Sequence, residues 1–213
     1  MSLKAVGGGG GGGSQPRIAA CMPIFNHPTA QTFYATKPLT GVTDFFSIRG
    51  LPLDRARNSL TAQALASPAT HFLWIDSDMA DIPPDAAERL LAHDLDIVGG
   101  LYWSRQPPYL PVLLREVDRQ VVIEENPPPC GVFPCAGVGA GFLLVRRQVF
   151  EAVATRFGFG SWWSFLPDRG DDVSFMLRAA RCGFTCHVDA DLRLGHVGEV
   201  VVTEAVAAAL RAT

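Results

Sequence analysis

Short apolar runs alternate along this chain with segments that have the composition of helices. The apolar runs lie at 18–25, 43–48, 71–75, 95–101, 141–145 and 184–188. A strand that is apolar on both sides has to lie in a sheet that is covered on both faces. Helices are expected at 54–66, from Pro83 onward, at 147–156 and at 171–181. This alternation predicts an α/β fold, a three-layer sandwich around a mostly parallel central sheet. The proline-rich stretch 106–134 is expected to form hairpins and loops beside a binding face.

Length and composition favour one folded domain. The chain has 213 residues, 48% of them apolar, which is enough for a single well-filled core. The unbroken glycine run at 7–13 has no side chains to bury. We therefore expect residues 1–16 to be a flexible tail and residues 17–213 to form one domain.

The same composition argues against several classes of partner. The formal net charge is -3, so the chain lacks the basic surface that binds a nucleic-acid backbone. No apolar run reaches the roughly 18 residues that span a bilayer, and the first residues do not form a signal peptide. The 5 cysteines do not have the C-x-x-C spacing of a metal site, so we expect them to be buried, reduced thiols. We expect a cytoplasmic protein with no nucleic-acid partner and no transmembrane segment.

Two carboxylates follow the apolar run at 71–75 directly, as Asp76-Ser77-Asp78. Ligands of open α/β sheets bind beyond the carboxyl ends of the strands. Magnesium and manganese are commonly held there by one or two carboxylates together with substrate phosphates. The motif therefore predicts a divalent metal site, although a D-x-D sequence also occurs in solvated turns.

A second acidic pair and a late histidine are the remaining candidates for chemistry. Asp171 and Asp172 open a helix, where one carboxylate suffices for capping and the other is available as a general base. His196 lies between Gly195 and Gly198, and its imidazole is suited to completing a metal shell.

These pieces together resemble the GT-A fold of nucleotide-sugar-dependent glycosyltransferases, with similarity to family 2. The matching segments lie at 21–26, 56–58, 74–79, 139–145, 170–175 and 196. The resemblance implies that Asp78 and His196 ligate Mn²⁺ or Mg²⁺. It implies that Asp76 contacts the metal or the donor ribose, and that Asp172 or Asp171 is the catalytic base.

The resemblance also implies a set of donor contacts. Pro23 and Asn26 occupy the donor-binding turn after the first strand, and Arg57 is placed to contact the nucleotide or its phosphates. Gly141 belongs to the glycine-rich strand beside the donor sugar. Trp163, with its neighbour in the same loop, is expected either to stack on a sugar or to clasp the loop by hydrophobic contact.

The function that follows is transfer of a hexosyl-type sugar from a nucleoside-diphosphate sugar to a saccharide or other hydroxyl acceptor. Inversion with an Asp base is expected, but retaining members also place acids in this region, so the stereochemistry stays open. Asp171 stands where such enzymes carry glutamate, so the base stays open between Asp171 and Asp172. One alternative is a non-catalytic nucleotide-sugar binding module. Another is a nucleotidyltransferase, but the basic glycine-rich loop of that class is missing after the first strand.

Overall fold

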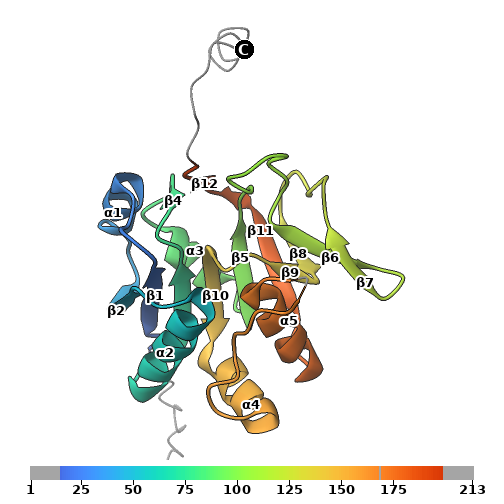
Figure 1. Ribbon diagram of the computed structural model, residues 1–213. Coiled ribbons are helices and arrows are strands. Elements are labelled where there is room, and N and C mark those ends of the chain that lie inside the picture. Colours follow the sequence, from blue (N-terminus) through green and yellow to red (C-terminus); the bar gives the residue numbers. More distant parts are fainter. Residues whose placement is uncertain (1–14, 168, 199–213) are drawn as a thin grey trace, which may run out of the picture.

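The computed structural model describes residues 15–167 and 169–198 (Figure 1). The glycine run at 7–13 and the residues after 198 lie outside this range, as do most of the expected tail and the end of the expected domain. None of the helices in the described ranges combines the length and the apolar composition required to cross a bilayer.

The central sheet contains seven strands in the order β2-β1-β3-β10-β5-β11-β8. Their bounds are β1 (Ile18–Ile24), β2 (Val42–Arg49), β3 (His71–Ile75), β5 (Ile97–Leu101), β8 (Val132–Cys135), β10 (Phe142–Arg146) and β11 (Cys186–Arg193). The pairings place β2, β1, β3, β5 and β11 in one direction and β10 and β8 in the other. The predicted α/β class with a mostly parallel sheet is therefore confirmed.

Helices cover both faces of this sheet (Figure 1). One face packs against α2 (Leu53–Ala66), α4 (Arg147–Phe157) and α5 (Asp171–Arg181), and the other against α3 (Ala86–Ala92). Side chains of β1 alternate between the two cores: Ala19 and Cys21 join the first, and Ala20 and Met22 the second. The three-layer arrangement follows from this burial on both faces.

Short elements lie outside the main sheet, some above it and some on its right-hand side in Figure 1. They are α1 (Ala30–Thr36), β4 (Met79–Ala80), β6 (Leu113–Val117), β7 (Gln120–Ile123), β9 (Gly137–Val138) and β12 (Gly195–His196). The proline-rich stretch forms the expected hairpin, since β6 pairs antiparallel with β7. β11 extends well past residue 188, where its strand was expected to end, because it pairs with both β5 and β8.

An aromatic cluster joins the loop before α5 to the core. The rings of Trp163 and Phe175 stack with centroids 4.4 Å apart, and Phe175 stacks in turn on Phe150 at 5.0 Å. Asn58 of α2 accepts the backbone N–H of Trp163 and donates to its carbonyl. The loop is thereby fixed to α2, which sets the position at which α5 begins.

We expect Phe175→Ala to lower the free energy of unfolding by about 3–5 kcal/mol, the usual cost of an aromatic cavity. Urea denaturation followed by circular dichroism measures this change. Phe25→Ala is the matched control, because Phe25 is 75% exposed. Similar losses in the two variants would contradict a central role for the cluster.

Candidate active site

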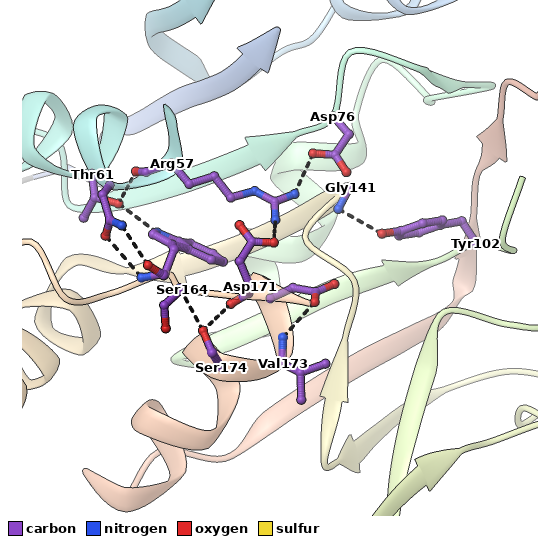
Figure 2. A network of polar contacts seen from close by, with 12 residues as sticks. Arg57, Thr61, Asp76, Tyr102, Gly141, Ser164, Asp171, Val173 and Ser174 are labelled. Atoms are coloured by element: carbon purple, nitrogen blue, oxygen red, sulfur yellow. Dashed lines mark hydrogen bonds and ion pairs between the residues drawn. The ribbon is translucent and has the colours of Figure 1, made fainter. Parts of the chain in front are cut away.

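The residues predicted to carry the chemistry lie together at the carboxyl end of β3. Asp76 follows β3 directly, and α5 brings Asp171 and Asp172 to the same place from the opposite end of the described chain (Figure 2). Arg57 reaches the site from the first half of α2. Elements far apart in sequence therefore contribute to one site.

The centre of this site is a buried ion-pair bridge. Arg57 Nη2 donates to Asp76 Oδ1 at 2.8 Å, and Arg57 Nη1 donates to Asp171 Oδ1 at 2.7 Å (Figure 2). Burial alone would lower the pKa of Arg57, but Asp76, Asp171 and Asp172 together raise it above its ordinary value. The guanidinium is therefore a permanent cation that holds two carboxylates at a fixed spacing.

This bridge gives Arg57 a positioning role, and its expected contact with the nucleotide stays a prediction. The sequence resemblance implied a direct contact with the nucleotide or its phosphates. In the structure Arg57 is only 2% exposed, and its guanidinium carbon lies 5.3 Å from the centroid of the Trp163 ring. Both terminal nitrogens are engaged by carboxylates, so the side chain positions the acids, and it also forms part of the wall of a cavity at the site.

The two neighbouring acids of α5 have different surroundings. Asp171 is buried, and its Oδ2 has no hydrogen-bond partner among the described residues. Burial raises the pKa of Asp171, and the Arg57 charge opposes that rise. Asp172 is half-buried, accepts the backbone N–H of Val173 at 2.7 Å and lines two of the cavities described below. Of the two, Asp172 is the more exposed carboxylate and lines more of the cavity surface.

Asp78 and His196 lie side by side. His196 Nε2 is 3.4 Å from Asp78 Oδ2, and His196 Nδ1 is 2.9 Å from the carbonyl oxygen of Trp103. A carbonyl only accepts, so Nδ1 carries the hydrogen and Nε2 faces the carboxylate. Burial alone would raise the pKa of Asp78, but hydrogen bonding to His196 and the charge of Arg105 lower it. Burial alone would lower the pKa of His196, whereas Asp78 and the Trp103 carbonyl raise it.

A two-stranded ladder brings His196 to the D-x-D turn. β12 pairs with β4, so that His196 lies opposite Met79, and Val197 N–H donates to the Asp78 carbonyl at 2.8 Å. Gly195 suits this close approach, because a Cβ at this position would lie 3.1 Å from Ala80 Cβ and 3.3 Å from the Ala80 carbonyl carbon. The backbone pairing of β12 with β4 therefore holds His196 beside Asp78.

The three-ligand metal centre expected from the sequence is only partly assembled. Among the residues that the structure describes, no three histidine, cysteine, aspartate or glutamate side chains lie close enough to share an ion. Asp78 and His196 are brought together, whereas Asp76 is bound to Arg57. Arg105 also forms an ion pair with Asp78. The donor set that fits a cation is thus one carboxylate and one imidazole, and other ligands have to come from elsewhere.

Two cavities meet at this pair. The first, of about 610 Å³, is lined by Phe25, Asn26, His27, Thr29, Ser77, Asp78, Arg105, Gln106 and Val197. The second, of about 360 Å³, is lined by residues that include Arg57, Asp76, Arg105, Gln106, Asp171, Asp172 and His196. Both volumes are in the range of small-molecule sites. Arg105 and Gln106 line both cavities and therefore mark the junction between them.

Three of the residues predicted to contact the donor are buried. Trp163 is 1% exposed, and its indole N–H donates to the Thr61 hydroxyl, so it clasps the loop and cannot stack on a sugar. Pro23 is buried within β1. Gly141 is also buried, and its N–H donates to Tyr102 Oη at 3.0 Å. Of the predicted donor turn, Asn26 does line the larger cavity.

Sequence reasoning missed residues that follow β5. The Tyr102 ring meets the His196 ring edge-on at 5.4 Å, and burial raises the pKa of its hydroxyl, with further contributions from Asp76 and Asp172. Arg105 contacts Asp78 from the same segment. The rule that ligands gather beyond the carboxyl ends of parallel strands would have found them, because the strand at 95–101 was predicted.

The chain is similar to known proteins in part of its sequence and in its fold. The sequence profile of the Anp1 family, a group of mannosyltransferase-like proteins, matches residues 47–110. No curated protein shows a significant sequence match. A solved structure of GalNAc-T7 with UDP, GalNAc and Mn²⁺ superposes with a TM-score of 0.55 and 11% identity, over 85% of this chain and 44% of that one. The chain has a GT-A-like fold.

A second solved structure shares this GT-A-like fold. It is A197 from STIV, a viral protein, with a TM-score of 0.51 and 13% identity, over 89% of this chain and 97% of that one. At such identities the likeness concerns the fold alone. The chain spans less than half the length of GalNAc-T7, whereas it spans nearly all of A197.

We expect Arg57→Met to destabilise the protein by about 3–5 kcal/mol, because it leaves a buried carboxylate without its partner charge. Urea denaturation at neutral pH measures this loss. Arg55→Met is the control, because Arg55 is exposed on the same helix. An Arg57→Met protein as stable as the control would show that the bridge contributes nothing to the fold.

Proposed function

We propose that this chain is a metal-dependent glycosyltransferase that moves a sugar from a nucleoside-diphosphate sugar to an acceptor hydroxyl. The observation that carries the proposal is the meeting of Asp78 with His196 beside a cavity that contains Asp172. The GT-A-like fold supports it. The Anp1 match supports it further, because residues 47–110 include Arg57 and both acids of the D-x-D motif. The catalytic unit is taken to be one domain over residues 17–213.

Asp78 and His196 are the proposed protein ligands of Mn²⁺ or Mg²⁺. A hard cation accepts one carboxylate and one imidazole when donor phosphates and water complete its shell. The Trp103 carbonyl fixes the imidazole through Nδ1, so that Nε2, on the Asp78 side, is the nitrogen that would ligate the ion. When bound, such an ion neutralises the charge that develops on a leaving diphosphate. The GalNAc-T7 structure, which contains UDP and Mn²⁺, is consistent with this assignment.

The larger cavity is the proposed nucleotide site. Asn26, Ser77 and Asp78 all line it, so a diphosphate bound against Asp78 would lie next to the proposed metal ligands. Arg105 is exposed and contacts Asp78 without burial, which leaves it free to turn toward phosphate. Its charge also offsets the negative charge of the site.

Asp172 is the proposed general base. It removes the proton from the acceptor hydroxyl as that oxygen forms a bond to the anomeric carbon. The bond from this carbon to the diphosphate oxygen breaks, and its electron pair leaves with the nucleoside diphosphate. The proton on Asp172 then passes to water. Attack from the face opposite the leaving group gives an inverted product, while Asp171 stays paired with Arg57 as a positioning residue.

A thermal-shift screen of UDP-, GDP-, CMP- and dTDP-sugars, with and without Mn²⁺, tests the donor class. A ligand that binds only the folded protein raises its melting temperature. We expect at least one donor to stabilise the protein in a manganese-dependent way. If no donor does so, a nucleotide-sugar enzyme is the wrong conclusion.

Asp172→Asn is expected to lower sugar transfer by about 10²–10⁴-fold, since it removes general-base catalysis. Donor binding should persist, because Asp172 is not a proposed ligand of the diphosphate. Product formation from a radiolabelled donor measures transfer, and calorimetry measures donor binding. A protein that binds the donor but shows no transfer even in its wild-type form would instead be a nucleotide-sugar binding module.

Asp78→Asn and His196→Ala are expected to weaken Mn²⁺ binding about tenfold or more, because each removes one of two protein ligands. Isothermal titration with MnCl₂ measures the change. Asp81→Asn is the control, since Asp81 is an exposed carboxylate three residues from Asp78, and asparagine tolerates its positive φ of 51°. Equal effects in the control and in Asp78→Asn would refute the assigned ligands.

A further inference from the structure

A third cavity adjoins the site on the side away from the proposed nucleotide pocket. It encloses about 280 Å³ between the small sheet β7-β6-β9 and the start of α5. The lining residues are Ser104, Leu110, Pro111, Val112, Leu113, Leu114, Ile123, Val138, Gly139, Asp172, Val173 and Met176. Of these described residues only Asp172 carries a charge. The cavity is therefore an apolar chamber with one carboxylate in its wall.

Well-packed side chains form this chamber. Leu113, Val138 and Met176 are between 2% and 3% exposed, so they belong to the protein core and make a firm wall. Leu114 of β6 and Ile123 of β7 are direct cross-strand partners and so project from the same face of the small sheet. Ile123 is 44% exposed, which places it where the chamber meets solvent.

The chamber is continuous with the carboxylate site. Ser104, Val112 and Asp172 line both the apolar chamber and the cavity that contains Asp76 and His196. A molecule in the chamber can therefore present one end to Asp172 while the rest contacts aliphatic side chains. Because Asp172 lines both cavities, a hydroxyl placed against it from the chamber would lie next to the proposed general base.

We propose that the acceptor is an alcohol carrying a hydrocarbon group, aliphatic or aromatic, which fills this chamber while its hydroxyl meets Asp172. This inference rests on the proposed glycosyltransferase function and narrows its acceptor. A saccharide in the chamber would leave several hydroxyls unpaired against leucine, valine and methionine, at a substantial desolvation cost. A hydrocarbon group gains from the same burial. The alcohol oxygen bonds to the anomeric carbon, its proton goes to Asp172, and the nucleoside diphosphate departs with the electron pair.

Binding of straight-chain alcohols from ethanol to 1-hexanol tests the chamber directly. Each methylene that enters it should tighten binding about fourfold, the ratio expected for burial of one such group. Protein labelled with ¹³C at the methionine methyl groups provides the readout, because Met176 lines the chamber and its signal should move. Affinity that does not change with chain length, or an unmoved Met176 signal, would overturn the proposal.

A matched pair of variants localises the effect. Ile123→Asp places a charge at the chamber mouth and should weaken 1-hexanol binding more than tenfold. Val122→Asp is the control, because Val122 is on the same strand, does not line the chamber and projects from the opposite face. The control should stay within about twofold of the wild type, and equal losses in both variants would refute the site.

Transfer assays separate this inference from the function on which it rests. With a donor that stabilises the protein in the presence of Mn²⁺, transfer to 1-hexanol should exceed transfer to glycerol by at least tenfold. Equal transfer to both alcohols would overturn the apolar acceptor and leave the glycosyltransferase in place. Hexanol binding without stabilisation by any of the UDP-, GDP-, CMP- or dTDP-sugars would overturn the function, and the acceptor assignment with it.

Discussion

The arrangement of the site depends on one buried cation. Arg57 forms ion pairs with Asp76 at the end of β3 and with Asp171 at the start of α5. Without this positive charge, carboxylates from two elements would repel each other at the sheet edge and lose their spacing. The bridge also decides which acid is free. Asp171 forms an ion pair with Arg57, whereas Asp172, one residue further along α5, lines the cavity as the more exposed acid.

The second organising contact is made by the backbone. The β4–β12 ladder fixes His196 beside the D-x-D turn, and α1 supports that turn from the other side. Thr32 of α1 donates its hydroxyl to the Met79 carbonyl at 2.7 Å, and Thr29 N–H donates to the Ser77 carbonyl. Asp78 therefore rests on a turn held from two sides, which limits the reorganisation required to bind a ligand. The three cavities then lie in sequence along this edge, from Asn26 through Asp78 and Asp172 to Ile123.

Several parts of the fold could be read from local pattern. The strand at 71–75 and the helix at 171–181 have the predicted bounds, because an apolar run ending in acids and an acidic helix start are strong local signals. The roles of Arg57 and Trp163 could not be read in this way. The family pattern placed Arg57 near a ligand and left Trp163 open between sugar stacking and a loop clasp. Only packing shows that Arg57 pairs with two acids and that Trp163 stacks on Phe175. Residue type indicates what a side chain is able to do, and burial decides whether a ligand can reach it.

The sequence by itself determined the α/β class, the mostly parallel sheet and the edge at which chemistry gathers. These properties follow from runs of apolar residues and from acids placed at strand and helix ends, which are local features of the chain. The family resemblance already implied that Asp78 lies near His196, whereas tertiary structure alone decided that Asp76 turns to Arg57 and that an apolar chamber adjoins Asp172. Arg57 is 19 positions from Asp76 and 114 positions from Asp171, and the order and register of the strands decide which of these residues come together in space. No local pattern encodes that distance.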